Sequence, residues 1–232
     1  MNTEKKKPTL LFDWDGTVVD SNEYKFNQVW VDTFEGEAEK QSKILEVLNN
    51  PETSKLFRYA LVGRVLSATE EGNEDLKDVL NDDKWLQNDE RIIKYTDRFA
   101  ELTKNHEKMP AFENSKNTLE ALKERGYPMY VVSGAGVNTI LEQAKLYNLE
   151  YFKDYFGNSD SKINHFKTIS IIEGTTDPSD YVVIGDGYAD FDLANKIGCR
   201  FIGIPCKWND WKKGEMDFET IDNIGELLKL LE

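Results

Sequence analysis

The sequence predicts an α/β protein, with a doubly wound parallel sheet and an all-α unit inserted after the first strand. Through the second half of the chain, short apolar runs alternate with segments of helical spacing, which is typical of a parallel sheet. From residue 20 to residue 108 the apolar residues recur at helical spacing, and no convincing strand is found. We therefore expect one unit made of residues 1–19 and 109–232, and a helical unit made of residues 20–108.

The strands of the first unit are predicted from short apolar runs of the kind found in buried parallel strands. These runs are Thr9 to Phe12, Met129 to Val132, Tyr181 to Ile184 and Phe201 to Ile204, with a weaker candidate at Phe218 to Ile221. Helices are expected around Leu119 and Leu122, from Val137 to Ala144, and over Lys162 to Ile172, Ala189 to Ile197 and Ile224 to Leu231. Gly126 and Gly198 stand where two of these helices should end.

The inserted segment contains four apolar faces at helical spacing. They are Phe26, Val29, Trp30 and Phe34; Ile44, Val47 and Leu48; Leu56, Ala60, Leu61 and Val65; and Ile92, Tyr95, Phe99 and Leu102. We expect the aromatic residues of the first face to form part of a core rather than a ligand site.

The composition is that of a soluble globular protein and argues against several functions. Of the 232 residues, 39% are hydrophobic and 31% are charged. The formal net charge of -14 argues against a nucleic-acid binder. No apolar run suits a membrane span or a signal peptide. Two cysteines, Cys199 and Cys206, indicate reduced thiols near the core of a cytoplasmic protein. Neither His106 nor His165 stands in a catalytic pattern, and we expect both on helix surfaces.

Polar residues follow three of the predicted strands at the point where each strand ends. Asp13 and Asp15 follow the first strand, Ser133 follows the second and Asp186 follows the third. Ligands of open parallel sheets bind at the carboxyl ends of the strands, which lie on one edge. We therefore expect these side chains to lie close together. Core packing does not require carboxylates there, because buried charges are costly unless they are paired or bind a metal.

Three carboxylates at one edge predict a cation site with oxygen ligands, and Mg2+ is its natural occupant. A carboxylate beside Mg2+ can attack phosphorus and form an aspartyl-phosphate. Lys162 opens a predicted helix and is a candidate for offsetting the charge of a phosphoryl group. Ser133, with the backbone amides of Gly134 and Ala135 at a helix start, is a candidate for holding phosphate oxygens.

These residues belong to motifs that resemble those of haloacid dehalogenase-like phosphatases, in the branch that contains phosphoglycolate phosphatases and beta-phosphoglucomutases. The motifs are Asp13-Trp14-Asp15-Gly16-Thr17, Val132-Ser133-Gly134, Lys162 and Gly185-Asp186-Gly187-Tyr188-Ala189-Asp190. The resemblance covers nearly the whole chain. It implies a Rossmann-like catalytic core over residues 1–19 and 109–232, a substrate-selecting helical cap over residues 20–108, and a hinge at Val18 to Tyr24.

The resemblance also implies a role for each acidic residue. Asp13 corresponds to the nucleophile that takes the phosphoryl group. Asp15 corresponds to the general acid and base, and its backbone carbonyl to a metal ligand. Asp13 and Asp186 supply the carboxylate ligands. Asp190 corresponds to a residue that orients metal-bound waters, and its four-residue spacing from Asp186 favours it over Asp192.

The phosphate-binding roles fall on Ser133, Gly134 and Lys162. Lys162 corresponds to the lysine that bridges the nucleophile and the phosphate, in competition with Lys167. By position alone, we expect the stretch from Arg58 to Asp75 to be the loop of the cap that sets specificity.

The expected activity is Mg2+-dependent hydrolysis of a small phosphorylated metabolite. Asp15 argues against a dehalogenase, and also against a phosphonoacetaldehyde hydrolase, even though Trp14 is shared with the latter. A phosphosugar mutase is the main alternative, although Lys25 replaces the histidine usual at the mutase cap entrance. A non-catalytic module that binds Mg2+ or phosphate is a third hypothesis, which Asp15 and the inserted unit disfavour.

Overall fold

The computed structural model describes residues 6–50, 53, 56, 58–70, 73–80 and 83–232. The chain divides into two compact units, one formed by Met1–Ser21 with Met109–Glu232 and the other by Asn22–Lys108. Among the described residues, no helix combines the length and the apolar character needed to cross a membrane.

The first unit is built on a six-stranded sheet with the order β3-β2-β1-β4-β5-β6, in which all neighbouring strands run parallel. The strands are β1 (Thr9–Phe12), β2 (Met129–Val132), β3 (Asp154–Phe156), β4 (Tyr181–Gly185), β5 (Arg200–Gly203) and β6 (Glu219–Thr220). This arrangement confirms the predicted parallel α/β fold. Because β1 lies between β2 and β4, the three strands that end in polar residues are adjacent.

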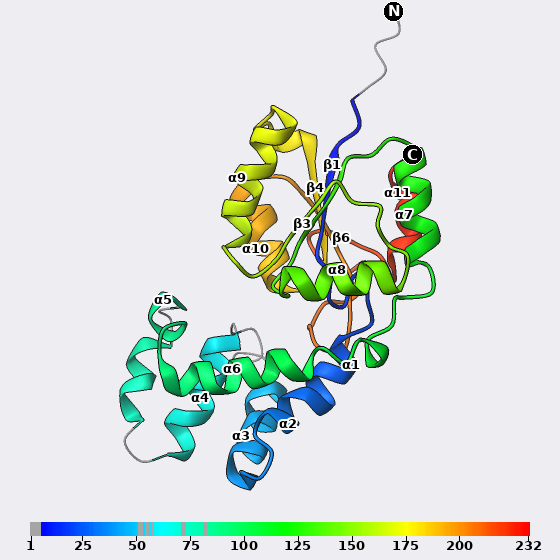
Figure 1. The fold of residues 1–232 in the computed structure, drawn as a ribbon. Coiled ribbons are helices and arrows are strands. Elements are labelled where there is room, and N and C mark those ends of the chain that lie inside the picture. Colours follow the sequence, from blue (N-terminus) through cyan, green and yellow to red (C-terminus); the bar gives the residue numbers. More distant parts are fainter. Residues whose placement is uncertain (1–5, 51–52, 54–55, 57, 71–72, 81–82) are drawn as a thin grey trace, which may run out of the picture. The chain divides into compact units, whose positions relative to one another are not determined.

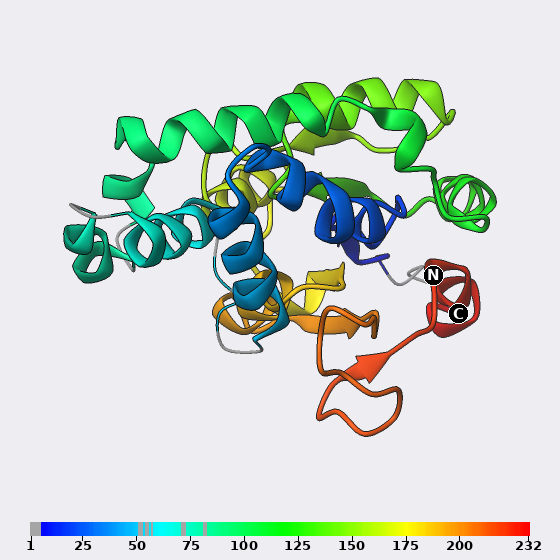
Figure 2. The same ribbon diagram turned by 90° about the horizontal axis from the view of Figure 1, so that it is seen from below.

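Helices cover both faces of this sheet (Figures 1 and 2). They are α7 (Ser115–Glu124), α8 (Val137–Leu146), α9 (Lys162–Glu173), α10 (Tyr188–Ile197) and the short α11 (Leu227–Leu230), which follows a 3-10 turn at Ile224–Glu226. Side chains of α7, α8 and α11 join one apolar cluster, and those of α9 and α10 join another. The sheet is therefore buried on both faces, as the apolar runs predict.

The strand residues alternate between these two clusters. On β1, Leu10 and Phe12 pack with the α7 and α8 face, whereas Leu11 packs with the α9 and α10 face. All three are at most 1% exposed. A strand buried this completely holds the residue that follows it, Asp13, in a fixed place.

The second unit is all helical among its described residues. Its elements are α1 (Asn22–Tyr24), a π turn (Lys25–Val29), α2 (Trp30–Thr33), α3 (Ala38–Asn49), α4 (Arg58–Thr69), a 3-10 helix (Glu74–Val79), α5 (Asp83–Leu86), α6 (Glu90–Leu102) and a 3-10 turn (His106–Lys108). Val29, Trp30 and Phe34 are buried in its core, as their spacing predicts. Phe26 only packs against that core from a partly buried position.

The prediction of a loop from Arg58 to Asp75 is wrong for most of this stretch. Arg58–Thr69 forms α4, with Ala60, Leu61 and Val65 in the core. The apolar spacing that predicts a helix there outweighs the argument from position. Residues 71–72 of this stretch lie outside the described residues.

Candidate active site

Asp13 lies where the sheet ladder ends. Its backbone N–H donates to the carbonyl of Ile184 over 2.9 Å, which extends the pairing of β1 with β4 by one residue. The side chain is then directed out of the sheet at the carboxyl edge and is only 8% exposed as a residue. Gly16, with a φ of 74°, turns the chain immediately afterwards.

Trp14, between the two acids, anchors this turn in the core. Its side chain is fully buried, and its indole N–H donates to Oε1 of Gln143 on α8 over 2.7 Å. The ring also makes edge contacts with Phe152 and Tyr155. Gln143 was not predicted as a site residue, because a single amide within a helix carries no sequence signal.

Asp15 is partly exposed and is oriented by its own loop. The hydroxyl of Ser21 donates to Oδ1 of Asp15 over 2.7 Å. Asp15 also pairs with Val19 as an isolated β-bridge. A carboxylate that is oriented by a hydrogen bond and remains partly exposed can exchange a proton with a bound molecule.

Lys162, the first residue of α9, joins two buried carboxylates. Its Nζ lies 2.9 Å from Oδ1 of Asp13 and 2.5 Å from Oδ1 of Asp190. Burial alone would lower the pKa of Lys162, but the negative charges of Asp13 and Asp190 raise it above its ordinary value. The two carboxylates therefore favour the cationic form of Lys162 at the end of β1.

Asp190 is 2% exposed and has both carboxylate oxygens engaged. Oδ1 accepts from Lys162, and Oδ2 accepts the backbone N–H of Gly187 over 3.2 Å. Burial raises the pKa of Asp190 above its ordinary value, against the opposing effect of the Lys162 ammonium. Gly185 makes room for this carboxylate, because a Cβ there would stand 2.3 Å from Cγ of Asp190.

Asp186 follows β4 and is 8% exposed. The Thr17 hydroxyl donates to its Oδ1 over 3.3 Å, and the Cys206 thiol lies 3.8 Å from its Oδ2. Its backbone carbonyl accepts from Nδ2 of Asn209 over 2.8 Å. The acid therefore contacts both the first motif and the loop after β5, although that loop gave no signal in the sequence.

Oxygen atoms of Asp13, Asp186 and Asp190 lie within 4.8 Å of one another. Carboxylate oxygens are the hard ligands that Mg2+ prefers. Since like charges this close repel, the charge and the donor chemistry of this cluster fit a divalent cation.

Ser133 is buried at the end of β2, where its N–H donates to the carbonyl of Phe156 over 2.9 Å. Its Oγ accepts the N–H of Ala135 over 3.2 Å. The amide of Ala135, which was expected to face a phosphate, is used within the loop. Because Oγ accepts that bond, the hydroxyl proton of Ser133 is directed elsewhere, while Gly134 remains exposed.

The competing candidates lie on the surface. Lys167 is exposed and contacts Asn164, and Asp192 is exposed on α10. The expectation of a surface position is wrong for His165, which is 6% exposed. Its Nε2 lies 2.7 Å from the carbonyl oxygen of Gly157, so helical spacing alone did not identify the face on which it lies.

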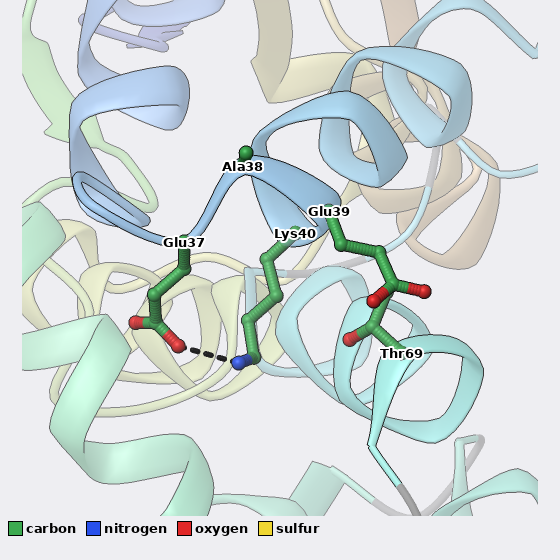
Figure 3. Close-up of a pocket in the computed structure, with 5 residues that line it drawn as sticks. All are labelled: Glu37, Ala38, Glu39, Lys40 and Thr69. Atoms are coloured by element: carbon green, nitrogen blue, oxygen red, sulfur yellow. Dashed lines mark hydrogen bonds and ion pairs between the residues drawn. The ribbon is translucent and has the colours of Figure 1, made fainter.

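A cavity of about 260 Å³ belongs to the second unit and is lined by Glu37, Ala38, Glu39, Lys40 and Thr69. Figure 3 shows Lys40 directed at Glu37. Lys40 also contacts Glu70 over 2.6 Å, and the Tyr95 hydroxyl donates to Glu37 over 3.0 Å. Lys40 thus pairs with two carboxylates, and none of the residues that line the cavity belongs to the carboxylate cluster.

Comparison with known proteins identifies a matching family and a related protein. Residues 7–198 match the sequence profile of haloacid dehalogenase-like hydrolases. Pyrophosphatase PpaX from Bacillus velezensis is 26% identical over 208 residues, which cover 87% of this chain and 85% of the relative.

Several solved structures share the fold. A predicted phosphoglycolate phosphatase from Haemophilus somnus has a TM-score of 0.65 at 18% identity, covering 99% of this chain and 100% of the other. The hydrolase YfnB from Bacillus subtilis, bound to magnesium, has a TM-score of 0.65 at 16% identity, covering 98% and 100%. CbbY from Rhodobacter sphaeroides, in complex with phosphate, has a TM-score of 0.63 at 15% identity, covering 95% and 96%.

Proposed function

The chain belongs to the haloacid dehalogenase-like hydrolase family, and we propose that this phosphoric monoester hydrolase uses Mg2+ and an aspartyl-phosphate on Asp13 to hydrolyse a small phosphomonoester. The observation that carries the proposal is the contact of Asp13 with Lys162 in a cluster that also contains Asp186 and Asp190. A carboxylate beside a fixed cation and a metal-binding set is suited to attack a phosphoryl group.

In this proposal Mg2+ is held by the carboxylates of Asp13 and Asp186 and by the backbone carbonyl of Asp15. When bound, the ion offsets negative charge on the phosphoryl group that is transferred. Asp190 is left out of direct contact, because Lys162 and Gly187 already engage both of its oxygens. Its role is to hold Lys162 and to orient the waters that complete the metal site.

The chain's own residues carry the chemistry in two displacements. A carboxylate oxygen of Asp13 forms a bond to phosphorus, the ester P–O bond breaks, and Asp15 protonates the departing alkoxide. Asp15 then takes a proton from water, the water oxygen attacks phosphorus, and the bond between Asp13 and phosphorus breaks to release phosphate. Lys162, Ser133 and the amide of Gly134 bind the phosphoryl oxygens during both steps.

The substrate class in this proposal is a small phosphorylated metabolite. Relatives named as a pyrophosphatase and a predicted phosphoglycolate phosphatase support a compact phosphate compound. We further propose that residues 22–108 act as the cap that selects the substrate, and that the protein is cytoplasmic, as its cysteine usage predicts.

The test is phosphate release from an aryl phosphate as a function of Mg2+ concentration. Wild-type protein and the exposed-site control Asp192→Asn should release phosphate only with the metal, and Asp13→Asn should release none. Phosphate release by Asp13→Asn at the wild-type rate would overturn the assigned nucleophile. Interconversion of sugar 1- and 6-phosphates that outruns phosphate release would instead support the mutase alternative.

A further inference from the structure

The side chain of Asn209 ties the loop after β5 to the backbone of Asp186. Its Nδ2 donates to the carbonyl of Asp186 over 2.8 Å and to the carbonyl of Ile204 over 3.1 Å. Its Oδ1 accepts the N–H of Cys206 over 3.1 Å and the N–H of Trp211 over 3.2 Å. Two donor hydrogens and two lone pairs are the full capacity of this amide, so every one is used.

This pattern fixes the orientation of the amide. Reversing it would direct the NH2 group at two N–H donors and the oxygen at two carbonyls. Aspartate at this position would lose both donors, and a smaller side chain would lose the bridge. The four contacts therefore require asparagine, even though no sequence motif contains it.

Asp186 needs external support because of its neighbours. It lies between Gly185 and Gly187, and glycine restricts the backbone least of all residues. Each residue of the tripeptide is held from outside. Gly185 accepts the N–H of Ile204 over 3.0 Å, Asp186 accepts from Asn209, and Gly187 donates to Asp190. Of these three contacts, the one to Asp186 comes from a side chain outside the recognised motifs.

The same loop also reaches the carboxylate of Asp186. The Cys206 thiol, whose backbone N–H is bound by Asn209, lies 3.8 Å from Oδ2, and Thr17 donates to Oδ1 from the other motif. Farther along, Trp211 packs edge-on against Tyr188, at a centroid distance of 5.3 Å, at the start of α10. The loop is thus joined to Asp186 at its backbone and at its side chain.

We infer that Asn209 is a positioning residue, which holds the Asp186 carboxylate where it can ligate Mg2+. This inference rests on the proposed function, because it takes Asp186 as a metal ligand. Residues that orient metal ligands from outside typically affect metal affinity by about 10- to 100-fold. Asn209 should therefore act on metal affinity rather than on binding of the phosphate ester.

The experiment compares Asn209→Ala with Asn117→Ala, which removes an exposed asparagine from α7 of the same unit. Mg2+ binding is measured by calorimetry without substrate, and aryl phosphate hydrolysis is measured at saturating Mg2+. We expect Asn209→Ala to raise the Mg2+ dissociation constant about tenfold and to change KM at saturating Mg2+ by less than about twofold. Asn117→Ala should match wild type in both measurements.

Asn209→Asp guards against a variant that does not fold, since it keeps the size of the side chain and an oxygen that accepts from Cys206 and Trp211. It lacks the NH2 group that donates to Asp186, so its Mg2+ dissociation constant should also rise about tenfold. Folding of each variant is checked by thermal unfolding without metal. If folded Asn209 variants bind Mg2+ as wild type does, the inference is wrong. If wild type itself binds no Mg2+, the proposed function is what fails.

Discussion

The ammonium nitrogen of Lys162 lies 2.9 Å from Oδ1 of Asp13, although 149 positions separate the two residues in sequence. The contact exists because β1 lies beside β2 and β4 and because α9 begins at the same edge. Lys162 contacts Asp190 at the same time, so one side chain connects the end of β1 with the first turn of α10. This bridge makes strong predictions for substitution.

Replacing Lys162 with methionine should harm both activity and stability. The change keeps the length of the side chain but leaves Asp13 and Asp190 without their shared cation. Removing one partner of a buried ion pair costs about 3–5 kcal/mol, and losing a charge aimed at the transition state lowers kcat by about 100- to 1000-fold. Chemical denaturation and phosphate release measure the two effects. Lys167→Met, on the exposed side of the same helix, should change neither, and equal effects of both variants would contradict the assignment.

Asp15→Asn should affect substrates according to their leaving groups. A positioned general acid contributes about 100- to 10,000-fold, and most where the departing oxygen is a poor leaving group. We therefore expect a large loss of kcat/KM, which covers only the first displacement, with an alkyl phosphate and a smaller loss with a nitrophenyl phosphate. Asp20→Asn, at an exposed neighbouring position, serves as the control. A uniform loss for both substrates would point to a damaged loop instead of a missing acid.

Gly185→Ala should disturb the site through Asp190. The new Cβ would stand 2.3 Å from Cγ of Asp190, so the carboxylate must leave its place beside Lys162. Overpacking of this kind costs about 1–3 kcal/mol, and activity should fall as well. Adding Asp190→Ala would still leave the Cβ of residue 190 only 2.6 Å from the new Cβ, so the double variant should regain neither stability nor activity. Unfolding midpoints and phosphate release for the single and double variants test this pattern.

Glu37→Gln should make the stability of the protein less dependent on acid pH. Burial would raise the pKa of Glu37, but the hydrogen bonds from Lys40 and Tyr95 outweigh it and hold this pKa below the ordinary value of 4.5. Glu37 therefore contributes stability above the unfolded-state pKa, and this contribution is lost as pH falls through the lowered folded-state pKa. Hydrogen bonds to charged groups contribute about 1.5–3 kcal/mol, so the variant should lose up to that amount at pH 7.

The free energy of unfolding of the Glu37 variant and of wild type should be measured from pH 7 down to a pH at which the Glu37 carboxylate is protonated. The difference from wild type should shrink as the pH falls below 4.5. Glu39→Gln, on the exposed side of the same cavity, is the matched control and should behave as wild type. A difference that stays constant with pH would mean that the charge of Glu37 is not responsible.

The sequence predicts those parts of the fold whose signal is local. Met129–Val132 is an uninterrupted apolar run because the strand is buried on both faces. β3 was missed because Asp154 is exposed and the strand has only three residues at the edge of the sheet. The end of α10 at Gly198 was predicted because a φ of 79° there favours glycine.

The residues of the candidate site likewise include some that the sequence predicts and some that it does not. The acids at the strand ends can be predicted, since parallel topology alone brings Asp13 and Asp186 to one edge. The roles of Gln143 and Asn209 could not be predicted from the sequence, because a single amide acquires its role from partners far away in the sequence. The burial of His165 could not be predicted either, because its partner is a backbone carbonyl outside its own helix.

The central place of β1 has a consequence for biosynthesis. The strand leaves the ribosome before its two neighbours, which begin only at Met129 and Tyr181. At about 5–20 residues per second, on the order of ten seconds pass before β2 exists. Over that time a largely apolar strand has two open edges, while the helices of residues 22–108 can already contact one another. We expect the nascent chain to depend on chaperone protection until translation passes β4.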